Sequence, residues 1–375
     1  MNFIYIAPHF PRNFHQFVLS LAEQGVHVLG IGQESYDDLP SAMQTAFVEY
    51  FRVRDIQDEE EVTRAVAFLF YRHGVIDCIE ALKREYVPFI AQLREQFHVT
   101  GAKPREVVRT QSRAKMSDYF KKAGIPHLSG VKVRTSMQLM RALKGRDFPI
   151  SLMNDDVNNQ EPLVLVNQEQ VEAFINDWSQ QTEAYFVLDD VVSGETYYYQ
   201  GLADHNGAIV YEKLVHQLPL NKNGLALFEI LPTLPAELRT LAHQAQESFK
   251  TKTGFFTLTF EYQGGQWIAV TFSTAPLAGL FVDALNFTDD RDLYMNYAQV
   301  VTHTALTASS PTAQMGLLAR RAVDFPSAIP FADIKEQFAH ELRFSQVSAD
   351  QENYIFVTTD SATKQAIVAA LTKKA

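Results

Sequence analysis

Apolar residues in the first hundred positions alternate between short runs and helical spacing. Residues 2–7 and 75–79 form largely apolar runs, which predict buried strands. From Phe14 to Ala22 the apolar residues repeat at i, i+3, i+4, i+7 and i+8, which places them on one face of a helix. Alternating strands and helices of this length predict a parallel α/β unit with right-handed crossovers.

Parallel sheets of this kind bind ligands beyond the carboxyl ends of their strands. This rule places the loop of residues 8–13, after the first strand, beside a crevice. Glu80 and Glu85 follow a later strand and would lie at the same edge. The simpler alternative is that Asn13 caps the first helix and the loop is solvated.

A second pattern, two strand-like runs around a short turn, occurs at residues 254–279. The strand-like runs 255–262 and 267–272 flank the sequence Gln-Gly-Gly-Gln at 263–266, which predicts a β-hairpin. Residues 196–203 and 208–213 predict another hairpin, around an Asp-His-Asn-Gly turn. The small polar residues after position 306 indicate a linker. Beyond it, three strand-like and two helical stretches predict a small α+β piece.

Composition narrows the class of protein. The chain of 375 residues has 46% apolar and 21% charged residues, an ordinary balance for a globular protein of two or three packed units. Its net charge of −11 gives no electrostatic basis for binding nucleic acid. We find no apolar run of about 20 residues, so no membrane span is expected. Cys78 is the single cysteine, and the early Pro8 and Pro11 argue against a signal peptide, so we expect a cytoplasmic protein.

Three ordered motifs carry a resemblance to a known family. They are Ala-Gly-Ile-Pro at 123–126, Phe-Pro-Ile-Ser-Leu-Met-Asn at 148–154, and the stretch 185–195 that ends in Ser-Gly-Glu. Together with the hairpin at 254–279 they resemble the ATP-grasp superfamily, whose members join a carboxylate to an amine or thiol using ATP. The fold class implied is α/β and α+β. The implied units are a pre-ATP-grasp α/β domain (1–108), a small lobe (109–183), a large lobe (184–306) and a C-terminal α+β piece (312–375).

The phosphate-binding positions of the family are altered in this chain. On the alignment, Arg113 takes the place of a lysine that reaches the phosphates, and arginine can still bind a phosphate bidentately. Met153 takes the place of a second lysine, and a thioether carries no charge and donates no hydrogen bond. The family's glycine-rich loop corresponds to residues 155–160, which contain no glycine and two aspartates. We expect these carboxylates to repel a triphosphate.

The adenine and ribose positions are better kept. Asp189 and Asp190 stand where the family has two glutamates, and Glu195 matches a family glutamate. Carboxylates on an edge strand are more often simply solvated. In register with the motif at 123–126, however, they support the assignment.

The metal positions are the strongest departure. The family holds Mg²⁺ with acidic residues and an asparagine, and the aligned residues here are Thr259, Thr271 and Ser273. Mg²⁺ needs near-octahedral oxygen ligands that usually include one or two carboxylates, which hydroxyls do not replace. Glu261 lies two residues after Thr259 on the same face of the strand, and with Asp283 it is the candidate for a relocated metal site.

Three functions remain open from these residues. The first is a catalytically degenerate ATP-grasp homologue that binds a small-molecule carboxylate or scaffolds a partner ligase. The second is an active ATP-dependent carboxylate–amine ligase that forms an acyl phosphate with a metal at Glu261 and Asp283. The third is a metal-free sensor of a nucleotide or small acid that uses Arg113, Asp190 and Glu195. ATP is the cofactor that the resemblance implies, whereas Mg²⁺ is doubtful, and the oligomeric state is not predicted.

Overall fold

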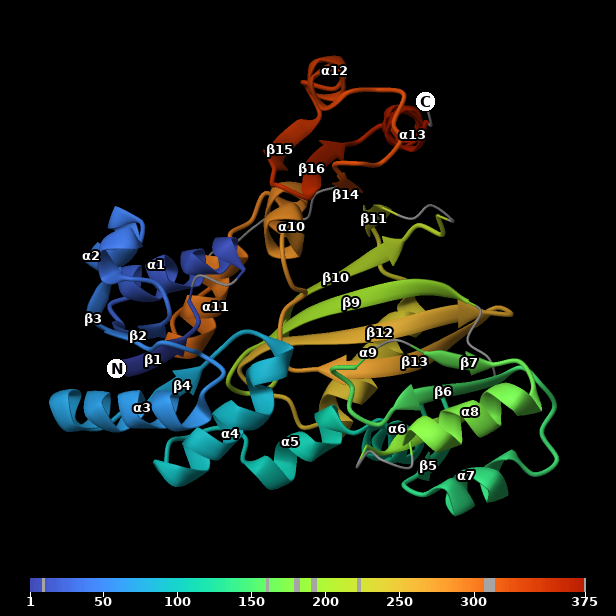
Figure 1. Ribbon diagram of the computed structural model, residues 1–375. Helices are drawn as coiled ribbons and strands as arrows, with labels where there is room; N and C mark the ends of the chain where they lie inside the picture. The colour runs from blue at the N-terminus through green and yellow to red at the C-terminus, as the bar shows by residue number, and fades with distance from the viewer. Residues whose placement is uncertain are drawn as a thin grey trace.

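Three β-sheets organise the chain (Figure 1). The computed structural model describes residues 1–8, 11–159, 162–178, 183–189, 194–220, 224–306 and 314–373. Within these ranges, no helix combines the length and the apolar character needed to cross a membrane.

The N-terminal sheet has four parallel strands in the order β3-β2-β1-β4. Phe3 and Tyr5 of β1 pack with α1 and α2, whereas Ile4 and Ile6 pack with α3 and α4, so both faces are covered. This confirms the predicted parallel α/β unit. The strands are β1 (Asn2–Ile6), β2 (His27–Gly32), β3 (Phe47–Arg52) and β4 (Cys78–Glu80). The helices are α1 (His15–Glu23), α2 (Ser41–Ala46), α3 (Glu59–His73) and α4 (Val87–Gln96), with 3₁₀ turns η1 (Arg12–Phe14), η2 (Tyr36–Asp38) and η3 (Arg84–Tyr86).

The fourth strand is shorter than the sequence predicts. It begins at Cys78 and not at Val75, whose side chain is 75% exposed. The side-chain amide of Asn2 donates to the backbone oxygen of Val75 at 2.9 Å, and the backbone N–H of Asn2 donates to the Asp77 carboxylate at 2.7 Å. These bonds fix residues 75–77 as a connection, so β4 pairs with β1 over only three positions.

A small lobe follows, built on an antiparallel sheet in the order β5-β8-β6-β7. Ile150 and Leu152 of β6 pack against α7 and α8 on one face, whereas Met153 points to the opposite face. The connecting helices are α5 (Pro104–Gln111) and α6 (Arg113–Lys122). The lobe contains β5 (Gly130–Val133), α7 (Ser136–Leu143), β6 (Ile150–Asn154), β7 (Leu163–Leu165), α8 (Gln168–Trp178) and β8 (Tyr185–Leu188).

The large sheet has eight strands in the order β13-β12-β9-β10-β11-β14-β16-β15, and every neighbouring pair is antiparallel (Figure 1). Its strands are β9 (Glu195–Ala203), β10 (Ile209–Gln217), β11 (Leu225–Leu231), β12 (Gly254–Gln263), β13 (Gln266–Ser273), β14 (Met315–Ala322), β15 (Leu342–Val347) and β16 (Gln351–Thr358). Its helices are α9 (Ala236–Ser248), α10 (Phe281–Asp289), α11 (Leu293–Thr302), α12 (Phe331–Gln337) and α13 (Ser361–Thr372).

The predicted hairpin at 254–279 is present as β12 and β13. Gly264 and Gly265 form its turn with φ of +58° and +83°, and tight hairpin turns need positive φ at both central residues. Glycine adopts that conformation without steric cost. The turn chemistry therefore accounts for the register in which the two strands pair.

The two faces of the large sheet have different partners. One face packs against α9, α12 and α13 through alternate residues such as Phe256, Leu258 and Phe260. The opposite face, here called the site face, carries Thr257, Thr259 and their register neighbours. At one end of the site face, α10 and α11 join the N-terminal unit in a shared apolar cluster.

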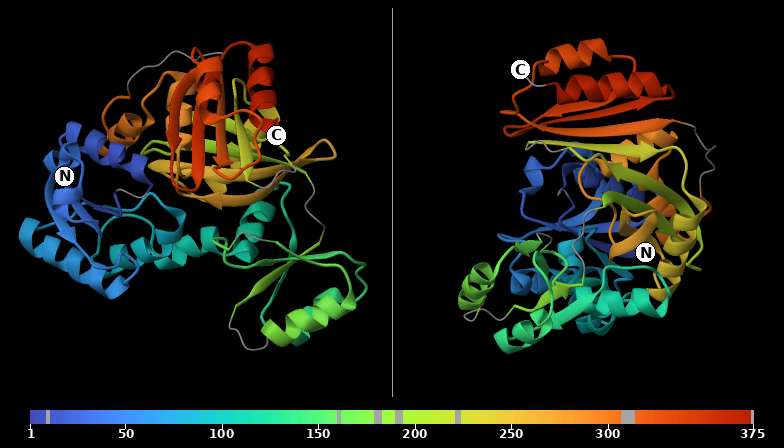
Figure 2. Two further views of the ribbon diagram at one scale, coloured as in Figure 1. Left: turned by 45° about the horizontal axis from the view of Figure 1, so that its top comes forward. Right: turned by 90° about the vertical axis from the view of Figure 1, so that its right-hand side faces the viewer.

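The three C-terminal strands continue the large sheet (Figure 2). Strand β14 pairs with β11 from Leu225 to Ile230, and α12 and α13 cover the same face as α9. The strands and helices predicted beyond residue 312 are therefore present, but their sheet is continuous with that of residues 195–273. The boundary at 306–312 stays a prediction.

Candidate nucleotide and ligand site

Two threonines meet at the positions that the resemblance assigns to metal ligands. Thr259 of β12 lies directly opposite Thr271 of β13, and the Thr271 hydroxyl donates to Thr259 Oγ1 at 2.8 Å. Ser273 lies opposite Thr257, and its Oγ accepts from the backbone N–H of Ala275 at 3.3 Å. The hydroxyls thus bond to each other and to the backbone.

This donor set does not fit Mg²⁺. Neutral hydroxyls supply dipoles and no charge, whereas Mg²⁺ is held in proteins mainly by carboxylates, phosphates and water. Binding a metal here would also break the bond between Thr271 and Thr259. Among the described residues, no three His, Cys, Asp or Glu side chains come together as a metal site would require.

The proposed relocated ligands lie toward opposite ends of β12. Glu261, near the hairpin, accepts a hydrogen bond from the Thr196 hydroxyl at 2.7 Å. Asp283, on α10, accepts from the Asn13 amide at 2.7 Å and from the Tyr294 hydroxyl at 2.8 Å, in the cluster that holds Phe255. Phe255 and Glu261 are six residues apart, or about 20 Å along a strand. The structure therefore gives the two carboxylates separate environments.

Burial raises the pKa of both Glu261 and Asp283, against the opposing effect of the hydrogen bonds that each accepts. The hydrogen bond from Asn13 to Asp283 also gives Asn13 a role that its position in the sequence does not indicate. It ties the loop after β1 to α10 and does not cap α1.

Apolar side chains occupy the face of the small lobe on which the family resemblance places a phosphate-binding lysine. Met153 of β6 lies opposite Phe186 of β8, and both pack with Leu188. Ala114 and Leu128 complete this cluster. Met153 is only 8% exposed, so it serves as a core residue here and offers no group to an anion.

Asp155 closes the start of helix α6. Its carboxylate accepts from the Ser112 hydroxyl at 2.7 Å and from the backbone N–H of Ala114 at 2.9 Å, and it forms an ion pair with Lys132. A helix N-terminus offers N–H groups to an anion. Here the carboxylate of Asp155 takes the place of an external anion at the start of α6. The sequence alone indicates only that Asp155 would repel a triphosphate.

Arg113 supports the neighbouring loop. Its Nε donates to the backbone oxygen of Asn154 at 2.8 Å, and its Nη2 donates to that of Asn159 at 3.0 Å. Burial lowers its pKa to about 10. The side chain is 4% exposed, so the guanidinium holds the 154–159 segment and is not open to a nucleotide in this conformation.

Arg84 adds a second buried cation near Arg113, which the sequence analysis missed. Nε and Nη2 of Arg84 and Nη1 of Arg113 are buried and have no hydrogen-bond partner in the described structure. Burial lowers the pKa of Arg84 to about 10, and Asp156 and Glu85 oppose this effect through their charge. The junction between the N-terminal unit and the small lobe therefore holds two guanidinium groups, which are opposed by the charges of Asp155, Asp156 and Glu85.

Two of the residues that the resemblance assigns to adenine and ribose contact other side chains. Asp189 is paired with Arg146 at 2.7 Å, and its side chain is 44% exposed. Glu195 accepts from the Tyr197 hydroxyl at 3.0 Å and lies 3.4 Å from His216 Nε2. Asp190 lies outside the described residues.

A crevice does open at the carboxyl ends of the N-terminal strands, as the parallel sheet predicts. It has a volume of about 710 Å³ and is lined by residues that follow β1, β2 and β4. Glu85 belongs to this lining and pairs with Lys83 at 2.5 Å, while Tyr86 and Phe89 add aromatic surface.

A guanidinium on the site face lacks a carboxylate. Arg320 of β14 lies 5.5 Å from the ring centre of Phe228 and 4.9 Å from that of Phe281. Its Nη2 donates to the backbone oxygen of Ala278 at 3.3 Å, and no described Asp or Glu lies within ion-pair distance. Burial lowers its pKa. The only sequence signal was a charged residue inside a predicted strand.

Comparison with known proteins establishes the fold. The sequence matches no family model and no curated protein. L-amino acid ligase from Bacillus licheniformis superposes with a TM-score of 0.73 at 11% identity, over 99% of this chain and 96% of that one. This chain has the ATP-grasp fold.

Two further solved structures agree. Phosphoribosylglycinamide synthetase from Anaerococcus prevotii gives a TM-score of 0.70 at 10% identity, over 99% of this chain and 97% of that one. The ADP complex of N5-carboxyaminoimidazole synthetase from Staphylococcus aureus gives 0.70 at 12% identity, over 99% and 96%. Each match covers 99% of this chain, so the three sheets together make up the shared fold.

The raised pKa of Asp283 predicts a pH effect on stability. A carboxyl whose pKa is higher in the folded than in the unfolded protein favours folding most below its unfolded value, near 3.8, and loses that contribution as pH rises through the folded value. We expect Asp283→Asn, which cannot ionise, to raise the free energy of unfolding relative to the unmodified chain at pH 8, with a smaller difference at pH 4. Urea unfolding at both pH values measures this.

Asp189→Asn, at the exposed ion pair, is the control, because no such gain is expected there. If Asp283→Asn lowers the free energy of unfolding by the same amount at pH 8 and at pH 4, the expected pH dependence is wrong. The contacts of Asp283 would then stabilise the protein by their geometry alone.

Proposed function

We propose that this protein is a non-catalytic ATP-grasp homologue that binds a small carboxylate without Mg²⁺-dependent turnover of ATP. The observation that carries the proposal is the hydrogen bond between Thr271 and Thr259 at the positions where the family resemblance calls for metal-binding carboxylates. These hydroxyls are each other's partners, and neither can neutralise a divalent cation.

The phosphate-binding elements support the same conclusion. Phosphoryl transfer depends almost entirely on positioning and on stabilisation of charge by metal ions and cations. Removing a single stabilising donor typically costs about 10²–10³ in rate. In this chain the metal ligands are hydroxyls, one lysine position is the buried Met153, and Asp155 covers the start of α6. The losses fall in one catalytic unit, and the described cations nearby, Arg84 and Arg113, have buried guanidinium nitrogens.

A cation on the site face supports binding of a carboxylate. The crevice at the N-terminal sheet does not, because its described lining holds Glu34, Glu59 and Glu85 against the single cation Lys83. On the site face, Arg320 lies over two aromatic rings, and within the described residues its guanidinium makes one hydrogen bond. A guanidinium with free N–H groups binds a carboxylate bidentately. These features favour a small-molecule ligand over a purely structural role.

A nucleotide titration tests the loss of catalysis. We expect calorimetry with ATP to give the same weak or undetectable binding with Mg²⁺ in excess over the nucleotide as with EDTA. We also expect no release of phosphate from ATP. Thermal unfolding should show no Mg²⁺-dependent shift on addition of ATP. A stabilisation by MgATP of several degrees that EDTA abolishes would contradict the proposal, because only a ligand of the folded state stabilises it.

The carboxylate anchor has its own test. We expect Arg320→Gln to weaken the binding of succinate, measured by calorimetry without metal, by about tenfold or more, the usual worth of a hydrogen bond to a charged group. Arg343→Gln, which removes a guanidinium bonded to the backbone oxygen of His340 on the exposed edge of the sheet, is the matched control. Equal loss in both variants, or none in Arg320→Gln, would remove Arg320 from the site.

A further inference from the structure

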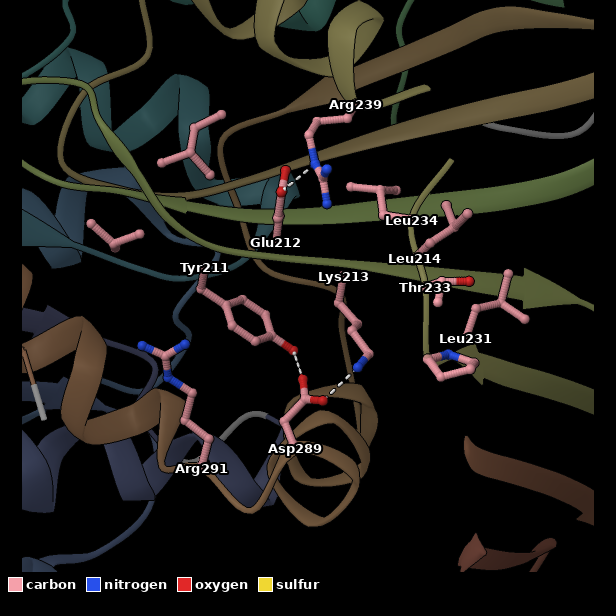
Figure 3. A pocket seen from close by; sticks show the side chains of 13 residues that line it. Tyr211, Glu212, Lys213, Leu214, Leu231, Thr233, Leu234, Arg239, Asp289 and Arg291 are labelled. Atoms are coloured by element: carbon pink, nitrogen blue, oxygen red, sulfur yellow. Dashed lines mark hydrogen bonds and ion pairs between the residues drawn. The ribbon is translucent and has the colours of Figure 1, made fainter. Parts of the chain in front are cut away.

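Strands β10 and β11 separate to form a fork. They pair only where Leu214–Gln217 of β10 lies opposite Phe228–Leu231 of β11. Residues 209–213 of β10 extend beyond this pairing, while the chain after Leu231 turns toward α9. A pocket of about 380 Å³ occupies the opening, here called the fork pocket (Figure 3). None of the residues assigned above to nucleotide, metal or succinate binding lines it.

The charges of the fork pocket do not cancel. Its lining contains three cations, Lys213, Arg239 and Arg291, and two carboxylates, Glu212 and Asp289, which leaves one positive charge. Asp289 forms an ion pair with Lys213 at 2.5 Å and accepts from the Tyr211 hydroxyl at 2.8 Å. Asp289 is therefore already satisfied within the protein.

Glu212 is satisfied as well. It pairs with Arg239 at 2.7 Å and accepts from the Tyr199 hydroxyl at 2.9 Å, and His243 Nε2 lies 3.0 Å away. Both carboxylates of the pocket thus have their cationic and hydroxyl partners, so neither provides a free anion for an incoming positive group.

Arg291 supplies the excess charge. Its Nε donates to Asn296 Oδ1 at 2.5 Å, and its guanidinium carbon lies 5.3 Å from the ring centre of Tyr211. No carboxylate within the described part of the chain forms an ion pair with it. The Nε of Arg291 is thus already bonded. The two terminal nitrogens of such a guanidinium carry parallel N–H groups whose spacing fits the two oxygens of a carboxylate.

Apolar side chains line the opposite side. Figure 3 shows Leu214, Leu231 and Leu234 across the pocket from Arg291, with Tyr211 and Lys213 between them. A pocket with an apolar wall and a few placed polar groups is the usual form of a small-molecule site. A ligand that touched both sides would combine an anionic head with an apolar tail.

We propose that the fork pocket is a second binding site, for a small carboxylate with an unbranched apolar tail. The carboxylate binds the Arg291 guanidinium, and the tail reaches Leu231 and Leu234. Binding there is independent of the succinate site proposed above, because the two sites share no residue and use different arginines.

The length of the ligand's apolar tail and the charge of its head group are the two properties to test. The unmodified full chain is titrated calorimetrically with butanoate, hexanoate and octanoate, and with hexan-1-amine as a cation of matched tail length. We expect affinity to rise along the carboxylate series by about fourfold for each methylene that becomes buried, and the amine not to bind. Inorganic phosphate, an anion without a tail, is expected to bind far more weakly than octanoate.

Two variants locate the site. Arg291→Gln is expected to weaken octanoate binding by about tenfold or more. Thr233 lies exposed on the rim, so Thr233→Glu introduces a repelling charge without disturbing the core, and Thr233→Gln is its neutral control. We expect Thr233→Glu to weaken binding and Thr233→Gln to leave it unchanged. Arg64→Gln, on the exposed surface of α3, controls for loss of a distant cation.

The proposal is overturned by any of three results: no octanoate binding up to millimolar concentration, equal binding of hexan-1-amine and hexanoate, or equal affinity in the unmodified chain, Arg291→Gln and Thr233→Glu. Loss of octanoate binding in these variants, with succinate binding intact, would separate this site from the one at Arg320. Binding of MgATP would contradict the proposed function, but it would leave the test of the fork pocket unaffected.

Discussion

The alternation of side chains along β12, held in register by its hairpin with β13, is the constraint on which the structure depends. Phe256, Leu258 and Phe260 enter the core beneath α9, while Thr257 and Thr259 face the site. Because successive residues point to opposite faces, the core and the site are separate sets of positions on one strand. A substitution on the site face therefore leaves the core side chains of the neighbouring positions in place. The fold can tolerate changes in the chemistry of the site face for this reason.

The altered positions are also mutually consistent. In the proposed function, the facing hydroxyls of Thr259 and Thr271 leave a triphosphate without a metal to neutralise it, and a lysine at position 153 would be a cation inside an apolar cluster. Met153 instead packs with Phe186. Asp155 would repel a bound triphosphate but stabilises the start of α6 when the nucleotide is absent. At these positions the chain makes contacts within the protein where the family resemblance would place contacts with a ligand.

Local patterns allowed much of the fold to be predicted. The Gly264-Gly265 turn, the helical spacing after Phe14 and the ordered motifs point to elements that the structure contains. The missed features depend on residues distant in sequence. Arg84 matters because it lies near Arg113, and the fork pocket arises because two strands separate beyond Leu214. No periodicity within one segment reports such contacts. Met153 was predicted to lack a phosphate contact, but its packing partners required the tertiary structure.

The central claim is that the site face has lost its affinity for a divalent cation beside a nucleotide. Electron paramagnetic resonance of Mn²⁺, which takes the same oxygen ligands as Mg²⁺, tests this claim most directly. With the full chain in excess and a non-hydrolysable ATP analogue present, the account predicts the spectrum of the Mn²⁺–nucleotide complex free in solution. A protein-dependent, broadened signal that disappears on competition with Mg²⁺ would contradict it.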